Sequence, residues 1–214
     1  MKTRKSLNEN NEIIQTESGL LAAELDMLQK LRVISLFGVL DEESLADISH
    51  LFVSLKDTAH QKTTNGDKAT EEIETIICPI DFYISTWGGD ALGMLALYDL
   101  MRLTREKCDI NTIGIGKVMS AGVLLLAAGT KGKRTIGKHT RIMLHAVRAS
   151  HYGAIHSLEN EMKETKWIQE QYINALVTET KMTKKYVKKT MNQKMDVYFD
   201  AEEAVKLGIA DIII

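Results

Sequence analysis

The chain has 214 residues, 44% of them hydrophobic, which is enough to bury one substantial core but cramped for two domains. Its 27 Lys and Arg nearly balance its 29 Asp and Glu, so a formal net charge of -2 provides no long-range field for holding nucleic acid or anionic lipid. Two cysteines without a CxxC spacing favour a reducing, cytoplasmic setting, and the longest apolar run, 121–128, is too short to span a membrane.

The first part of the chain predicts a flexible segment and then one folded domain. Residues 1–18 are polar and lack an apolar period, so we expect them to be flexible, with a single domain over 19–214. Residues 31–38 predict a strand, and apolar residues at helical spacing predict a helix over 41–55. The range 57–72 is rich in Thr, Asn, Gly and Lys, and it predicts a surface loop.

The middle of the chain alternates between the two kinds of element. Strands are predicted over 80–86, 110–116 and 141–147, and helices over 91–103 and 120–129. This alternation predicts an α/β fold with a largely parallel sheet.

The last part of the chain contains a long amphipathic pattern. Residues 157–181 predict a helix of roughly 35 Å, which would reach beyond a compact domain and suggests a partner subunit. Asp200 is expected to cap a short helix that ends at Gly208, before a final strand.

Ser120 is the first candidate for chemistry. It lies between Gly116 and Gly122, where a predicted strand meets a predicted helix, and such a turn can hold a serine hydroxyl clear of the backbone, as a nucleophile needs. Serine at a helix start is also a common cap, so the local pattern leaves both interpretations open.

A serine nucleophile needs a base, and His145 is the best placed of the six histidines. It closes the stretch "TRIMLH", where an imidazole at a strand end could reach the sheet edge at which open α/β sheets bind ligands. A half-buried histidine bonded to backbone is the alternative. The histidines form no HExxH or Cys-paired spacing, so we expect no metal.

Acyl transfer also needs donors for the developing oxyanion. Backbone N–H groups at glycine-rich turns supply them, and the Gly88–Gly89 turn and Ala121 could together provide two. The alternative is that "WGGD" is only a tight connection.

Three stretches of the sequence occur in an order and spacing that a known family shares: "ISTWGGDALGMLALYDLMR", "GKVMSAGVLLLAAGTKGKRTIGKHTRIMLH" and "DAEEAVKLGIAD". They resemble the proteolytic subunit of the Clp protease, ClpP, and the similarity extends over about 30–214. The resemblance implies a ClpP/crotonase-like fold of repeated βαβ units, with 157–181 as a protruding handle helix. It also implies site roles for six residues: Ser120 as nucleophile, His145 as general base, Gly89 and Ala121 as oxyanion donors, and Gly88 and Gly153 as substrate contacts.

The sequence departs from the family pattern in two places near these residues. The family's Asn-Ser-Pro-Gly-Gly turn is Ser-Thr-Trp-Gly-Gly here, which loses the rigid proline but keeps the glycines. The glycine-rich strand after His145 becomes "AVRASHYGA" and keeps only Gly153.

The third member of the triad is ambiguous in the sequence. Counting back from "AEEA" places the family's aspartate on Asn192, and counting forward from the preceding helix places it on Thr190. Asp196 is the nearest aspartate and our first hypothesis, with Asn192 holding the imidazole as the alternative.

The resemblance implies a compartmentalised serine endopeptidase that works through an acyl-enzyme without a cofactor. We expect heptameric rings stacked as a tetradecamer, and, because the chain has no Walker A motif, an AAA+ unfoldase ATPase that feeds unfolded proteins and peptides. A catalytically impaired ring subunit is the second hypothesis. A crotonase-type acyl-CoA hydratase or isomerase is the third.

Overall fold

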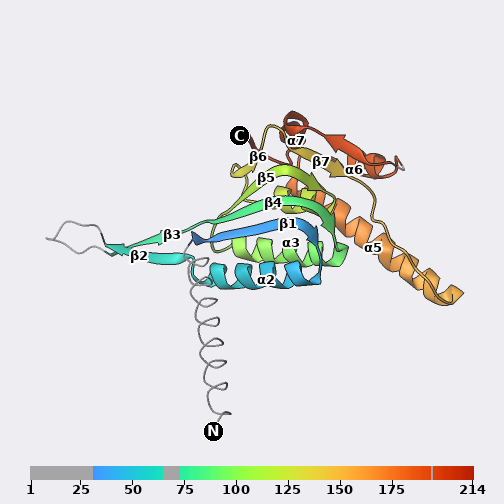
Figure 1. Ribbon diagram of the computed structural model, residues 1–214, viewed down its shortest axis with the longest axis horizontal. Coiled ribbons are helices and arrows are strands. Elements are labelled where there is room, and N and C mark those ends of the chain that lie inside the picture. The colour runs from blue at the N-terminus through green and yellow to red at the C-terminus, as the bar shows by residue number, and fades with distance from the viewer. Residues whose placement is uncertain (1–30, 65–72, 194) are drawn as a thin grey trace, which may run out of the picture.

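The structure is a computed structural model that describes residues 31–64, 73–193 and 195–214 (Figure 1). The predicted flexible segment, 1–18, lies outside these residues. In the described part, one sheet has the central order β1-β4-β5-β6-β9, with β7 paired to β5 and β8 paired to β7. Its strands are β1 (Val33–Leu40), β4 (Ile80–Gly89), β5 (Ile110–Met119), β6 (Arg134–Ile136), β7 (Arg141–Leu144), β8 (Val197–Phe199) and β9 (Ile212–Ile213).

The predicted α/β class with a largely parallel sheet is confirmed. Neighbouring strands of this sheet are parallel except for β7 and β8, which are antiparallel. The helices between and after the strands are α2 (Glu42–Asp57), α3 (Ala91–Arg105), α4 (Ala121–Ala127), α5 (Ile155–Glu179), α6 (Lys184–Met191) and α7 (Ala201–Leu207).

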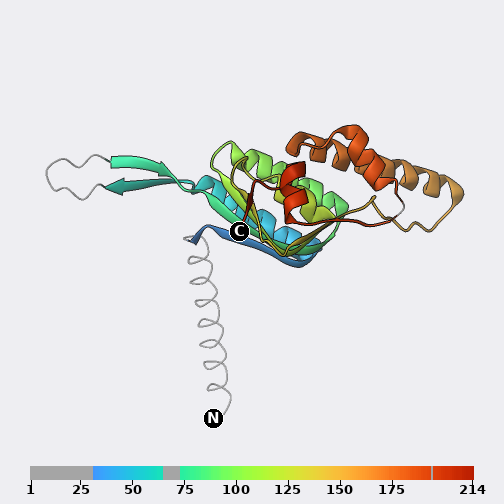
Figure 2. The ribbon, with the colours of Figure 1, turned by 90° about the horizontal axis from the view of Figure 1, so that it is seen from above.

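The core lies between the sheet and the helices that cover one of its faces. Figures 1 and 2 show α2 and α3 side by side against this face. Alternate residues of β4 are buried, and the Phe82 ring meets the Phe52 ring of α2 edge-on, with centroids 5.4 Å apart. Asp41 and Asp90 fix the starts of α2 and α3 by accepting hydrogen bonds from N–H groups in the first turn.

Two segments extend away from this body. α5 projects beyond the sheet at one end, and a two-stranded hairpin, β2 (His60–Thr64) with β3 (Ile73–Ile77), projects at the other (Figure 1). The hairpin corrects the expectation of a loop over 57–72, because β2 lies inside that range. The polar composition concealed this strand, whose backbone pairs with the apolar run 73–77.

The end of the chain follows the prediction closely. Asp200 caps α7 by accepting a hydrogen bond from the Glu203 N–H at 2.8 Å, and Gly208 ends the helix with φ 74°. Strands β4, β5 and β7 run in the same direction, so their carboxyl ends meet at one edge of the sheet. The candidate residues follow these three strand ends.

Candidate active site

Ser120 occupies a tight turn between the end of β5 and the start of α4. Its backbone has φ 54° and ψ -118°, a strained conformation for a residue with a side chain. Its side chain makes no capping hydrogen bond, so the geometry does not support the helix-cap interpretation. A strained strand-to-helix turn is the form that holds a serine hydroxyl away from the backbone.

Two neighbouring elements fix the backbone of this turn. The Ser120 N–H donates to the carbonyl of Met143 in β7 at 2.8 Å. The Ser120 carbonyl accepts a hydrogen bond from the Tyr172 hydroxyl of α5, also at 2.8 Å. Tyr172 is buried, and burial raises the pKa of its phenol, which keeps the hydroxyl a donor. No local pattern marks Tyr172, because the contact joins residues 52 positions apart.

Gly88 and Gly89 allow the end of β4 to approach its neighbours closely. A Cβ added at Gly88 would lie 2.6 Å from the Ser120 Cβ, and one at Gly89 would lie 2.0 Å from the Leu40 carbonyl oxygen. Both glycines also have positive φ. The Thr86 side chain, which sequence reasoning did not single out, accepts from the Gly88 N–H at 3.0 Å and donates to the Gly38 carbonyl at 2.8 Å. The turn is therefore braced without the family's proline.

His145 directly follows β7, at the same sheet edge as Ser120. Its ring Nδ1 lies 2.5 Å from the carbonyl oxygen of Ala146. A carbonyl can only accept, so in the neutral ring Nδ1 carries the proton and Nε2 is left with the lone pair. This is the tautomer that a general base acting through Nε2 requires.

Ser120, His145, Gly89 and Ala121 line one cavity of about 620 Å³. The remaining wall comes from the start of α3, the loop after β7 and one side of α5: Trp87, Asp90, Ala91, Leu92, Met94, Ala146, Val147, Arg148, Ala149, His151, Glu161, Glu164, Thr165, Ile168 and Tyr172. Most of the exposed lining is apolar, as in sites that take organic ligands. The Ala121 N–H is at the first position of α4, where an amide has no intrahelical acceptor.

Asp196 and Asn192 line different hollows. The antiparallel register of β7 and β8 ends at the pair Leu144 and Val197, and His145 and Asp196 are the next residues beyond that pair. Both residues line a smaller hollow of about 150 Å³. Asn192 ends α6 and lines a separate hollow against α5 that does not include His145. The fold thus brings Asp196, rather than Asn192, to His145.

The Asp196 carboxylate does not hydrogen-bond to the imidazole. Its Oδ1 forms an ion pair with the Arg148 guanidinium, from the loop that follows His145. Sequence reasoning did not identify Arg148, since nothing in the pattern pairs it with a residue 48 positions later.

The remaining predicted positions contribute less to the cavity. Gly88 packs closely against the Ser120 turn but does not line the cavity. Gly153 lies in the segment before α5 and does not line the cavity either. Across the described ranges, no group of three or more His, Cys, Asp and Glu residues is arranged to hold a metal ion. None of the helices described there has the length and apolar character to cross a membrane.

Comparison with known proteins places this geometry in a family context. A family model described as Clp protease matches residues 69–214. The chain is 35% identical over 135 residues to the ATP-dependent Clp protease proteolytic subunit 4 of Rhodococcus jostii, an alignment covering 63% of this chain and 68% of the relative. It is 34% identical over 135 residues to the ATP-dependent Clp protease proteolytic subunit of Deinococcus radiodurans and 33% identical over 136 residues to the ATP-dependent Clp protease proteolytic subunit 2 of Chlamydia pneumoniae. These two alignments cover 63% of this chain and 64% of each relative, so the chain spans just under two thirds of their length.

Proposed function

The chain belongs to the Clp protease family, and we propose on this basis that it is a serine endopeptidase subunit in which Ser120 is the nucleophile. The observation that carries the proposal is the strained Ser120 turn, whose side chain caps no helix and which lines one cavity together with His145. The strained backbone conformation at Ser120 costs free energy of folding, and such strain is typical of turns that present a nucleophilic serine.

The proposed reaction is acyl transfer in two steps. The Ser120 Oγ attacks the peptide carbonyl carbon while His145 Nε2 takes the hydroxyl proton. The N–H groups of Gly89 and Ala121 receive the developing oxyanion, and His145 then returns the proton to the departing amine. Water hydrolyses the ester formed at Ser120, with His145 again acting as base.

Asp196 is the proposed third member of the triad. Its position opposite His145 in the β7–β8 register supports this role, and the separate location of Asn192 argues against the alternative. In this role a carboxylate would orient the imidazole and stabilise its protonated form.

We propose that the subunit works in heptameric rings stacked as a tetradecamer in the cytoplasm. The projection of α5 beyond the sheet supports a handle helix between rings and a ClpP/crotonase-like arrangement of the βαβ units (Figure 1). Exposed apolar side chains on α5, such as Met162 and Trp167, are consistent with a covering partner. An AAA+ unfoldase would feed unfolded proteins into the chamber.

A second candidate is a catalytically impaired ring subunit. One observation favours it: His145 Nδ1 contacts a backbone carbonyl, while the Asp196 carboxylate pairs with Arg148. Without a carboxylate partner, the imidazolium that forms in the transition state is less stabilised.

Intact mass spectrometry after treatment with a fluorophosphonate separates these candidates. We expect one adduct per chain in the wild type and none in Ser120→Ala. Asp196→Ala should label more slowly, whereas the matched variant Asn192→Ala should label like the wild type. Purified alone, the wild type should cleave short peptides but not folded proteins. No adduct on correctly assembled rings would refute the peptidase and leave the impaired subunit.

A further inference from the structure

His145 and Asp196 line the same small hollow, yet each uses a different partner. His145 Nδ1 is 2.5 Å from the Ala146 carbonyl oxygen, and Asp196 Oδ1 pairs with Arg148 Nη2. His145 directly follows β7 and Asp196 directly precedes β8, next to the last pair of the ladder, Leu144 and Val197. What decides whether they interact is the direction of the two side chains.

Arg148 is placed to influence this choice. It lies three residues after His145, and it lines both the main cavity and the smaller hollow that His145 shares with Asp196. Its side chain is 70% exposed and that of Asp196 is 29% exposed. An ion pair with one partner largely in water is weak, so the guanidinium can leave the carboxylate at small cost.

We propose that Arg148 is a positioning residue that determines whether Asp196 accepts the Nδ1 proton of His145; this inference rests on the proposed function. While Arg148 pairs with Asp196, the His145 Nδ1–H donates its hydrogen bond to the neutral Ala146 carbonyl. When the guanidinium withdraws, the carboxylate becomes the acceptor and its negative charge stabilises the imidazolium. Arg148 therefore restrains the general base.

The main cavity also contains other charged and titratable groups. Asp90 caps α3, and His151 lies 3.6 Å from the Glu161 carboxylate. Glu164 and the buried Tyr172 come from α5 on the opposite wall. Arg148 and Asp196 are the charged side chains that share the smaller hollow with His145.

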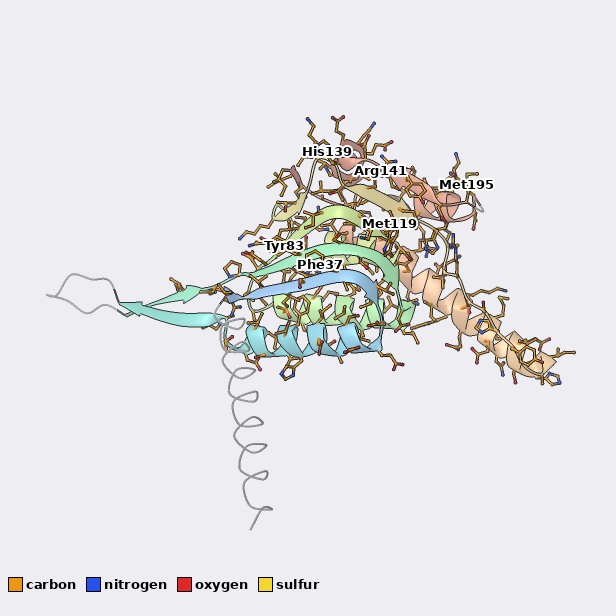
Figure 3. All side chains as sticks on the ribbon, in the orientation of Figure 1. Phe37, Tyr83, Met119, His139, Arg141 and Met195 are labelled. Carbon is orange, nitrogen blue, oxygen red and sulfur yellow. The ribbon has the colours of Figure 1, made fainter. Side chains whose placement is uncertain are left out.

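The test measures the second-order rate constant for fluorophosphonate acylation of Ser120 between about pH 5 and pH 9. The variants are Arg148→Gln, Arg148→Lys, Asp196→Asn and the double variant Arg148→Gln/Asp196→Asn. Arg141→Gln is the matched control, because Arg141 is an exposed arginine at the other end of β7, away from Met195 and the Asp196 region (Figure 3).

We expect Arg148→Gln to raise the plateau rate constant roughly tenfold and to move the acidic limb of the profile to higher pH, because an unpaired carboxylate favours a protonated neighbour. Arg148→Lys and Arg141→Gln should keep the wild-type profile. The double variant should match Asp196→Asn, since the gain requires the carboxylate.

Two results would overturn the inference. One is an unchanged rate constant and pH profile in Arg148→Gln while Ser120 still labels. The other is a gain that persists in the double variant, which would mean that the arginine acts by another route. Absence of Ser120 labelling in every variant would instead refute the proposed peptidase, so the two failures are distinguishable.

Discussion

The ion pair between Asp211 and Arg134 should stabilise the protein in a strongly pH-dependent way. Arg134 of β6 is buried, and its guanidinium contacts Asp211 through Nε at 2.7 Å and Nη2 at 2.5 Å. The same guanidinium donates from Nη1 to the carbonyls of Ala127 and Glu179 at the ends of α4 and α5. Asp211 thus neutralises the Arg134 guanidinium, which links the C-terminal ends of α4 and α5. These are the helix that follows the Ser120 turn and the helix that contains Tyr172.

The magnitude follows from the titration of Asp211. Hydrogen bonding to Arg134 outweighs the opposing effect of burial and lowers the pKa of the Asp211 carboxyl from 3.8 to about 2. At about 1.4 kcal/mol for each pH unit, this difference corresponds to about 2 kcal/mol of stability at pH 7. Because the folded-state pKa is the lower one, this stability is present above pH 3.8 and is lost as the pH falls through about 2. About half of this stability should remain at pH 3.

The assay is urea unfolding of Asp211→Asn at pH 7 and pH 3, followed by far-UV circular dichroism at one fixed protein concentration, because assembly makes stability concentration-dependent. We expect a loss of about 2 kcal/mol at pH 7 and about half of that at pH 3. The matched control is Asp109→Asn, whose partner Lys133 and own side chain are both nearly half exposed, and its loss should be below about 0.5 kcal/mol. Equal losses for Asp211→Asn at the two pH values would refute the electrostatic reasoning.

Two further substitutions test how the Ser120 turn is held. Gly88→Ala should reduce fluorophosphonate labelling roughly 100-fold, because the new Cβ would lie 2.6 Å from the Ser120 Cβ. Gly38→Ala, at a similarly positive φ but with nothing within 4 Å, should keep labelling while losing about 1 kcal/mol of stability, and equal labelling of the two variants would contradict the packing argument. Tyr172→Phe should lose about 1 to 2 kcal/mol and label a few-fold more slowly, because the Ser120 carbonyl loses its 2.8 Å hydrogen bond. The exposed Tyr186→Phe should match the wild type in both urea unfolding and labelling.

The sequence predicted the elements whose pattern is local and strong. The strand over 80–86, the helix over 91–103 and the capped helix after Asp200 all correspond to observed elements, with boundaries shifted by a few residues. Their signals come from apolar spacing and from caps, which depend only on neighbours in the chain. Gly88 and Gly89 were also identifiable, because close backbone approach restricts a position to glycine.

The short elements were missed because tertiary pairing creates them. β6 and β8 have only three residues each, too few for a period to appear, and they exist because β5 and β7 offer them free edges. β2 was assigned to a loop on its polar composition. The contacts that brace the active-site turn, from Thr86 and Tyr172, join distant parts of the chain and leave no trace in local spacing.

The third member of the proposed triad shows most clearly why counting along the chain fails. Ser120 and His145 each directly follow a strand, and these two strands pair in parallel. A sequence motif that matches both strands therefore also predicts the relative positions of the two residues. The proposed acid, Asp196, directly precedes β8, an antiparallel strand that follows a helix and a short connection. Extra residues in that connection change the number of positions counted along the chain. They do not change which residue lies next to His145, because the pairing of Leu144 with Val197 sets the register of the two strands. Counting from the two sides gave Asn192 and Thr190, whereas the register supports Asp196, the first hypothesis from the sequence. Slower labelling of Asp196→Ala than of Asn192→Ala is the outcome that this reasoning requires.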